Sequence, residues 1–303
     1  MSAAPSATVV APPAPSPAPT SGATRRAVLS FGRTGLRSFP WRDTRDPWAI
    51  LVSEVMLQQT SPARALEPYG LFLERFPTVR ACAAASPGDV LRAWAGLGYN
   101  RRARNLHRAA VLMMEKHDGS VPDDLDALRA LPGIGPYTAR AVLVFAYEAD
   151  EAVVDVNVAR VIARAVVGAP LSVAQTQAVA DRLVPGGRGW LWNQSLMEIG
   201  AVFCGARPAC DGCRLARSCA WAGAGCPSPD PATPGMPQST FAGSDRQGRG
   251  LLVSALRTGP VAPRTLAAAC GWPDDLPRAR RVADALVTEG LVRRGPGGVM
   301  TLP

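Results

Sequence analysis

From Leu131 to Ala139 the chain reads LPGIGPYTA. Apolar residues recur at helical spacing before this stretch, and Pro136 suits the first turn of a second helix, so a hairpin between two helices is predicted. Gly133 and Gly135 would let a phosphate approach the backbone closely, and the unpaired N–H groups at the start of a helix can bind it. An ordinary helix–helix turn would have a similar sequence, and the residues alone leave this alternative open.

The rest of the chain is predicted to be mainly α-helical. Short breaks containing Pro or Gly separate apolar residues that recur every three to four positions, over 48–58, 88–95, 102–114, 124–130, 137–147, 157–167, 173–183 and 190–203. Three short helices (246–257, 263–270 and 277–290) and a hairpin around residues 295–298 then follow a winged-helix pattern. The Ala- and Pro-rich residues 1–22 are predicted to form a disordered tail.

The composition excludes several classes of protein. With 303 residues, 47% of them hydrophobic and 19% charged, the chain is long enough for two globular domains. No stretch approaches the ~18 uninterrupted apolar residues of a transmembrane helix, and no signal peptide is indicated. The formal net charge is +9, and Lys116 is the single lysine among 33 Lys and Arg residues. An excess of arginine favours phosphate binding, although a coding bias toward arginine explains it equally well.

Four of the seven cysteines are crowded into the pattern Cys204-x5-Cys210-x2-Cys213-x5-Cys219. This density indicates a metal centre in a reducing compartment rather than disulfides. Zinc sites usually show two close pairs of ligands, whereas one close pair with longer flanking spacers suits a [4Fe–4S] cluster. Cys226 follows seven residues later as an alternative ligand.

Two carboxyl groups are candidates for catalysis. Glu54 shares a predicted helix face with Ile50, Leu51 and Leu57, and partial desolvation there should raise its pKa toward that of a general acid. Asp155 follows an apolar run and precedes another predicted helix. A satisfied buried carboxyl is the alternative for Glu54, and a helix N-cap is the alternative for Asp155.

Together these features resemble the helix-hairpin-helix DNA glycosylases, and within them the adenine glycosylases of the MutY type. The resemblance covers about residues 36–220, in family order. Its most diagnostic segment is SEVMLQQT at 53–60, and the hairpin and the cysteine loop are shared with endonuclease III-like relatives. The matching segments are 39–42, 53–60, 96–107, 131–139, 155–161 and 193–200, which lead into the cysteines.

The resemblance implies a role for each matching residue. Glu54 matches the general acid that protonates adenine, and Asp155 matches the carboxylate that stabilises an oxocarbenium-like sugar on the other side of the extruded nucleotide. Asn157 and Tyr137 match residues that support this carboxylate and the attacking water. The adenine pocket would be lined by Trp41, Arg42, Leu57 and Gln194. DNA would be contacted by Gln58, Gln59, Tyr99, Gly133 and Gly135, with Gln59 and Tyr99 as wedges, and the cluster ligands would be Cys204, Cys210, Cys213 and Cys219.

Tyr137 occupies the position at which bifunctional relatives carry their lysine nucleophile. The single lysine, Lys116, lies at the polar end of another predicted helix, so water is the expected nucleophile. The chain departs from the family pattern in its first cysteine spacer of five residues, where six are usual, and in Val156 and Asn100. The residues after Cys226 lack a Nudix-type pattern and look more like the short winged-helix tails of actinobacterial members.

We therefore expect a mainly α fold of the helix-hairpin-helix DNA glycosylases. A six-helix barrel would span 49–147 and an iron–sulfur helical domain would span 24–48 and 148–226. A linker at 227–245 and a winged-helix-like domain at 246–303 would follow. The expected substrate is double-stranded DNA in which adenine is mispaired with 8-oxoguanine or guanine.

We expect the protein to act as a cytoplasmic, nucleoid-associated monomer with no membrane contact. The alternatives are a thymine/uracil mismatch glycosylase of the same superfamily, and a non-catalytic iron–sulfur regulator that binds DNA.

Overall fold

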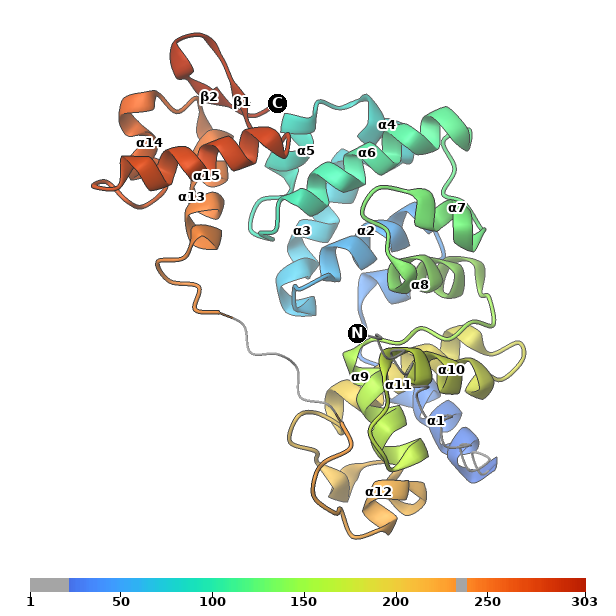
Figure 1. Ribbon diagram of the computed structural model, residues 1–303. Helices are drawn as coiled ribbons and strands as arrows, with labels where there is room; N and C mark the ends of the chain where they lie inside the picture. Colours follow the sequence, from blue (N-terminus) through green and yellow to red (C-terminus); the bar gives the residue numbers. More distant parts are fainter. Residues whose placement is uncertain (1–21, 233–238) are drawn as a thin grey trace, which may run out of the picture. The chain divides into compact units, whose positions relative to one another are not determined.

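The computed structural model describes residues 22–232 and 239–303 and divides into two compact units (Figure 1). The first unit comprises the chain up to Leu36 and from Ala152 to Pro234. The second comprises Arg37–Glu151 and Gly235–Pro303. The predicted boundaries lay at 48/49 and 147/148; residues 37–48 belong to the second unit because Trp41 packs edge-on against Tyr69 there. The predicted tail lies outside the described residues, except for Gly22, which begins a helix.

The second unit is built from helices, followed by a small C-terminal hairpin. Its first part contains η1 (Pro40–Arg42), α2 (Pro47–Leu57), α3 (Pro62–Arg75), α4 (Val79–Ala84), α5 (Pro87–Ala93), α6 (Arg101–Lys116), α7 (Leu125–Ala130) and α8 (Pro136–Tyr147). Its last part contains α13 (Asp245–Thr258), η5 (Pro263–Thr265), α14 (Leu266–Ala269), α15 (Leu276–Thr288), β1 (Arg293–Arg294), η6 (Pro296–Gly298) and β2 (Met300–Thr301).

Helix α2 lies inside this unit. Every residue from Trp48 to Met56 is buried, which is the pattern of a helix surrounded by core on all sides. Asp46 caps its start by accepting a hydrogen bond from Trp48 N at 3.0 Å. The Trp48 indole N–H donates to the carbonyl of Phe76 at 2.9 Å, which ties α2 to the end of α3. Glu54 is therefore held in a rigid, largely apolar setting.

The first unit consists of α1 (Gly22–Thr34), α9 (Val156–Val161), the π-helical η2 (Ile162–Val167), α10 (Val173–Leu183) and α11 (Gly189–Val202), then η3 (Cys210–Gly212), η4 (Ala216–Ser218) and α12 (Ala220–Gly223). Its core contains Val28 of α1, Ile162, and Trp192 and Ile199 of α11. Three of the cysteines, among them Cys204, pack against this core, so the cysteine loop is part of the unit rather than an appendage.

The predicted helices agree with the structure to within a residue or two at most ends, and the strands in the described residues lie where the hairpin was expected. Four α-helices were missed: α1, α3, α4 and the short α12. Pro68 lies inside α3 and reads as a helix breaker, yet α3 buries Ala65, Tyr69 and Phe72 on one face and continues to Arg75. Tertiary packing thus overrides the local signal.

The C-terminal segment (residues 239–303) is fixed to α5 and α6. Arg257 of α13 donates to the Leu91 carbonyl at 2.9 Å and to Asn100 Oδ1 at 2.8 Å. The last residue, Pro303, accepts a hydrogen bond from Gly88 N at 2.8 Å. β1 and β2 pair in antiparallel register, Arg293 opposite Thr301. The segment is therefore an integral part of the second unit.

Arg102 of α6 makes an unusually dense set of hydrogen bonds for one side chain. Its Nη1 donates to the carbonyls of Val55, Met56 and Gln58 at 2.9, 2.7 and 2.5 Å. Its Nη2 donates to Thr60 Oγ1, Leu97 O and Gly98 O at 3.0 to 3.2 Å. Residue 102 is only 8% exposed, so these contacts fix the end of α2 and the loop before α6 from the interior.

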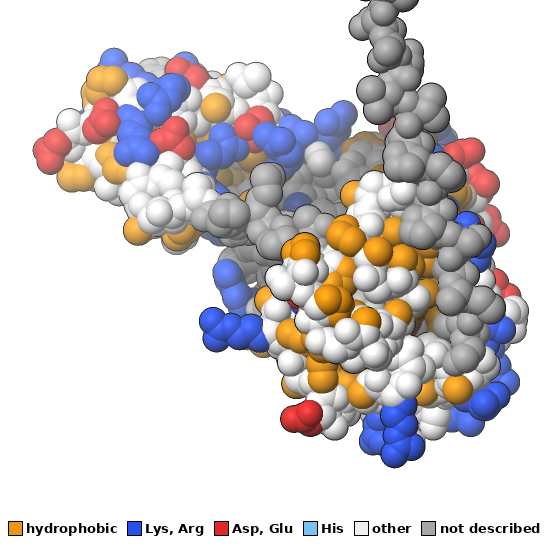
Figure 2. All heavy atoms as spheres, turned by 60° about the horizontal axis from the view of Figure 1, so that its bottom comes forward, with side chains coloured by type: hydrophobic (Ala, Val, Ile, Leu, Met, Phe, Trp, Pro, Cys, Tyr) orange, Lys and Arg blue, Asp and Glu red, His pale blue; other side chains and the backbone are white. Residues whose placement is uncertain are grey.

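Charge is unevenly spread over the surface. Figure 2 shows hydrophobic side chains, interspersed with backbone and other uncharged atoms, over much of the face that lies at the bottom of Figure 1, with Lys and Arg side chains at its margins. No helix within residues 22–232 and 239–303 combines the length and the apolar character needed to cross a membrane.

Replacing Arg102 by Met should lower the free energy of unfolding by roughly 3 kcal/mol, because several buried carbonyls would lose their only charged donor. Urea unfolding followed by circular dichroism measures this. Arg129→Met is the matched control, since Arg129 is half-exposed and has only a 3.6 Å surface pair with Asp126. Equal stability of the two variants would contradict the assignment.

Candidate active site

Glu54 lies in the second half of α2 and is 7% exposed, as its apolar neighbours predicted. Leu57, the last residue of α2, is half-buried, and Gln58 follows it. Gln58 Nε2 donates to Thr138 Oγ1 of α8 at 3.1 Å. The end of α2, which carries Glu54, is thereby joined to the first turns of α8, which carries Tyr137.

Both predicted wedge residues have left-handed backbone conformations. Gln59 has φ +57° and is exposed, and Tyr99 has φ +46° and is 44% exposed. Non-glycine residues seldom adopt positive φ, and such strain is concentrated at functional sites. Arg102 holds both turns: it donates to Gln58 O and Thr60 Oγ1 around Gln59 and lies 5.6 Å from the centre of the Tyr99 ring.

The hairpin lies between α7 and α8, as predicted. Gly133 has φ +81°, and a Cβ there would meet the side chain of Asn105 at 2.8 Å, so α6 packs too closely for any other residue. Gly135 caps the start of α8, whose first residue is Pro136. Both glycines are exposed, which leaves the backbone accessible to a ligand.

Trp41 and Arg42 belong to η1, on an aromatic cluster. Trp41 is 8% exposed; it stacks on Phe39 with centroids 5.1 Å apart and meets Tyr69 edge-on. The Arg42 guanidinium lies 5.1 Å from the centre of the Phe39 ring and donates to Arg37 O at 2.7 Å. The structure therefore gives both predicted pocket residues fixed orientations.

Asp155 is the N-cap of α9, and its two oxygens have separate partners. Oδ1 accepts from Val158 N at 2.7 Å, and Oδ2 accepts from Asn157 Nδ2 at 2.6 Å. Burial raises the pKa of Asp155, while these two hydrogen bonds and the charge of Arg160 oppose the rise. The capping role proposed as the alternative is thus real, and one oxygen is held by the predicted supporting residue.

Arg160 links this carboxylate to the cysteine loop. Its Nη2 donates to Asn157 Oδ1 at 2.7 Å and its Nε donates to the carbonyl of Cys204 at 2.8 Å. α9 and α11 approach so closely that a Cβ on Gly200 would lie 2.6 Å from the Asn157 carbonyl. Gln194, also on α11, is 5% exposed.

The four predicted metal ligands border one cavity with apolar walls, which Ile199, Phe203 and Trp221 help to form. Burial raises the pKa of the Cys210, Cys213 and Cys219 thiols. Within the described residues, no three metal-binding side chains are grouped as the ligands of a single ion. Cys226 is exposed and does not border the cavity.

Three of these sulfurs accept hydrogen bonds. Leu215 N donates to Cys213 Sγ at 3.4 Å, Ala222 N donates to Cys219 Sγ at 3.5 Å, and Arg164 Nη1 donates to Cys204 Sγ at 3.5 Å. Such N–H···S contacts stabilise the charge of metal-bound thiolates and tune iron–sulfur centres. The chemistry of the donor set thus fits a cluster.

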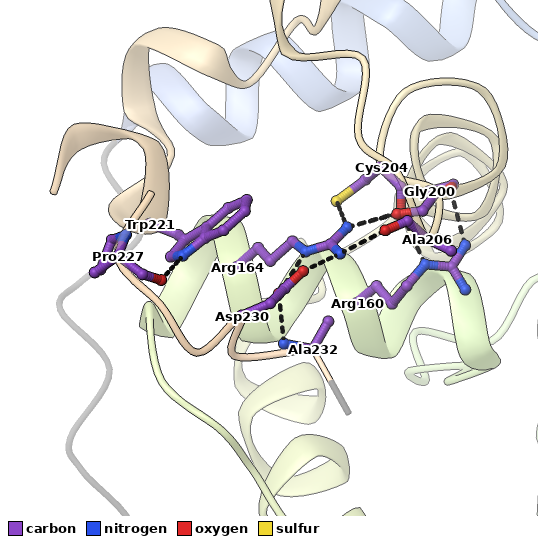
Figure 3. A network of polar contacts seen from close by, with 10 residues as sticks. Arg160, Arg164, Gly200, Cys204, Ala206, Trp221, Pro227, Asp230 and Ala232 are labelled. Carbon is purple, nitrogen blue, oxygen red and sulfur yellow. Dashed lines mark hydrogen bonds and ion pairs between the residues drawn. The ribbon is translucent and has the colours of Figure 1, made fainter. Parts of the chain in front are cut away.

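Arg164, in the π-helical η2, anchors the chain on both sides of the cysteine loop (Figure 3). Its side chain is 3% exposed and forms an ion pair with Asp230 at 2.5 Å. Nη1 also donates to the Gly205 carbonyl at 2.7 Å, and the guanidinium lies 5.3 Å from the centre of the Trp221 ring. The start of the predicted linker is therefore held against the first unit.

The predicted site residues are divided between the units. The second unit contains the general-acid candidate, the hairpin, the wedges and most of the adenine-pocket residues: Glu54, Tyr137, the hairpin glycines, the wedges, Trp41, Arg42, Leu57 and Gln58. The first unit contains Asp155, Asn157, Gln194 and the cysteines. Three arginines that position these residues, Arg102, Arg160 and Arg164, were not predicted from the sequence. Arg102 had a detectable signal, because it lies at helical spacing with buried Leu106 and Ala109.

Comparisons with known proteins agree with this picture. The family model described as HhH-GPD superfamily base excision DNA repair protein matches residues 52–184. The adenine DNA glycosylase of Mycolicibacterium smegmatis is 44% identical over 282 residues, which cover 91% of this chain and 94% of that protein. That of Mycobacterium tuberculosis is 43% identical, covering 91% of this chain and 92% of the relative.

A solved structure supports the fold. A thermostable thymine-DNA glycosylase superposes with a TM-score of 0.60 at 30% identity, over 65% of this chain and 94% of its own. The comparisons confirm the predicted enzyme class and set aside the alternative of a non-catalytic regulator. This chain belongs to the adenine DNA glycosylases, which are base excision repair enzymes of the helix-hairpin-helix superfamily.

Proposed function

We propose that this enzyme hydrolyses the N-glycosidic bond of adenine mispaired with 8-oxoguanine or guanine in double-stranded DNA. It acts as a monofunctional glycosylase and as a monomer, on the nucleoid DNA of the cytoplasm. The observation that carries the proposal is the Asp155 carboxylate, held by Val158 N and Asn157 Nδ2 at 2.7 and 2.6 Å.

Adenine leaves poorly as an anion, so an acid must protonate it. Glu54 takes this role, because a buried carboxyl on a rigid helix keeps its proton more readily than an exposed one. Trp41, Arg42, Leu57 and Gln194 contact the extruded base. Gln59 and Tyr99 fill the space it leaves in the duplex, which offsets a flipping cost of ~a few kcal/mol.

As the bond breaks, positive charge develops on the sugar. The ionised Asp155 stabilises this charge, and its two hydrogen-bond donors keep the carboxylate oriented. Two carboxyl groups in different surroundings thus supply one acid and one anion at the same pH.

Water is the nucleophile. Tyr137 has no amine with which to form a Schiff base, and the single lysine, Lys116, is exposed in the last turn of α6. The hairpin N–H groups near Gly133 and Gly135 bind the DNA backbone.

A [4Fe–4S] cluster is held by Cys204, Cys210, Cys213 and Cys219. Two observations support this assignment. The four cysteines border one apolar cavity, and three of their sulfurs accept hydrogen bonds from N–H groups. When bound, the cluster supplies a cross-link that fixes the cysteine loop. Through Arg160, that loop supports Asn157 and hence Asp155.

On a duplex containing an A:8-oxoguanine pair, the enzyme should release adenine, and the strand should break only after hot alkali. A denaturing gel with and without alkali measures this. Glu54→Gln should reduce the single-turnover rate by about 10²–10⁴-fold, as loss of a general acid does, with duplex binding retained.

Glu67→Gln is the control for that variant, since Glu67 is exposed on α3. Cleavage without alkali would contradict a monofunctional enzyme. Excision from G:T but not A:8-oxoguanine duplexes would favour the thymine/uracil alternative, to which the 30% identical thymine-DNA glycosylase gives weight.

Asn157→Ala should move the acidic limb of the pH–rate profile to higher pH. The donor at Asn157 stabilises the ionised form of Asp155 and so lowers its pKa; without it the pKa rises further above the usual range. Activity, which needs the ionised form, is then lost earlier as the pH falls. Single-turnover rates across pH measure the shift. Gln177→Ala, whose amide donates to the Ala152 carbonyl at 3.2 Å and to Asp181 Oδ1 at 2.8 Å and makes no contact with Asp155, should leave the limb in place.

Purified protein should show the broad visible absorption of a [4Fe–4S] cluster and bound iron. Cys213→Ser should remove most of both, because a ligand is lost, whereas Cys226→Ser should retain them, because Cys226 does not border the cavity. Colourless, iron-free wild-type protein, or equal loss in the two variants, would refute the ligand set.

A further inference from the structure

A basic cavity lies within the second unit, where the C-terminal segment meets α6. Its volume is about 580 Å³, and the residues around it come from α6, the end of α15 and β1. Four arginines border it, Arg104 and Arg108 from α6 and Arg293 and Arg294 from β1, against one acidic residue, Glu289. None of these residues has a part in the adenine chemistry described above.

The single acidic residue is already neutralised. Glu289 pairs with Arg249 at 2.6 Å and with Arg101 at 3.1 Å, and its backbone carbonyl accepts a hydrogen bond from Arg104. Arg294 pairs with Asp284. In the part of the chain that the structure describes, Arg108 and Arg293 have no polar partner, and both are exposed. The cavity thus carries uncompensated positive charge.

The charge is arranged in a line. Arg101, Arg104 and Arg108 are three and four residues apart on α6, so they lie on one face of the helix. This row begins two residues after Tyr99, one of the predicted wedge residues, and reaches the cavity with Arg104 and Arg108. Burial and the charges of Arg108 and Arg101 lower the pKa of Arg104, and its Nε is buried without a partner. An anion beside the row would oppose the repulsion between these like charges.

The cavity is preformed rather than a gap beside a loose tail. Arg257 and Pro303 tie the C-terminal segment to α5 and to the loop before α6 by hydrogen bonds of 2.8 to 2.9 Å. The two segments that carry Arg108 and Arg293 are thus held together before a ligand binds, so less chain entropy is lost on binding.

We propose that Arg108 of α6 and Arg293 of β1 bind backbone phosphates of the substrate duplex beyond the wedge residues, while Arg101 and Arg104, which are bonded to Glu289, add positive charge on the same face of α6. The C-terminal segment thereby acts as a second DNA-binding element that extends the interface of the glycosylase unit. The proposal rests on the proposed function only in taking duplex DNA as the ligand. Phosphodiesters match guanidinium groups in charge and geometry.

The test is the salt dependence of duplex binding, which counts phosphate contacts. Full-length Arg108→Ala/Arg293→Ala protein should bind a 30-base-pair undamaged duplex with a slope of log K against log [salt] shallower by about 2 than wild type, since each lost phosphate contact removes about 1. Fluorescence anisotropy at several salt concentrations measures the slope.

The matched control, Arg80→Ala/Arg129→Ala, removes the same charge from exposed positions on α4 and α7. It should keep the wild-type slope. Thermal unfolding shows whether both proteins fold alike; if the test variant is unstable, Arg108→Gln/Arg293→Gln replaces it.

Equal slopes for the test and control variants would overturn the proposal. So would calorimetric binding of inorganic phosphate at this cavity with no change of slope, because the site would then serve a free anion. The salt slope is measured on undamaged duplex, so it does not depend on catalysis. Failure to excise adenine from either mispair would refute the proposed function, but the comparison of slopes would remain valid.

Discussion

The buried guanidinium of Arg102 constrains the end of α2, which carries Glu54, and both predicted wedge residues. α2 ends at Leu57, so the carbonyls of its last turn have no partner within the helix. Arg102 donates to two of them, at Val55 and Met56, and a positive charge at a helix C-terminus is favourable in addition. The same group reaches Leu97 O and Gly98 O. One side chain therefore holds both left-handed turns that present Gln59 and Tyr99.

The first unit uses the same device around its cysteines. Arg160 donates to the Gly200 carbonyl, in the last turn of α11, and to the Cys204 carbonyl beyond it, while Arg164 donates to carbonyls of the following loop. A lysine has three donors on one atom and could not reach several carbonyls in a plane as the guanidinium fork does. The near absence of lysine is thus useful to the fold wherever a loop carries consecutive inward-facing carbonyls.

Periodicity predicted helices such as α6 and α10 because each buries one face. The hairpin was predictable because Gly133 and Pro136 are required by its local backbone conformation. Local rules failed at α3, where packing of Tyr69 and Phe72 outweighs Pro68. At the site, the cysteines were identified from their spacing and the two carboxyl groups from their sequence context, while their specific roles came from the resemblance. The arginines that orient them were not, because their partners are carbonyls far along the chain, such as Gly205 for Arg164. Every residue has a backbone carbonyl, so the sequence does not show which carbonyls will accept a hydrogen bond from a distant arginine.

The excess of arginine had two explanations at the level of composition, phosphate binding and coding bias. The structure adds a third, since Arg102, Arg160, Arg164 and Arg257 are occupied by carbonyls and by Asn or Asp side chains within the protein. Such residues contribute to the net charge of +9, but most of their donors are taken up within the protein. Charge available for DNA must instead come from arginines such as Arg108 and Arg293, which are exposed. Counting partners, rather than residues, therefore distinguishes arginines that build the fold from those that can bind phosphate.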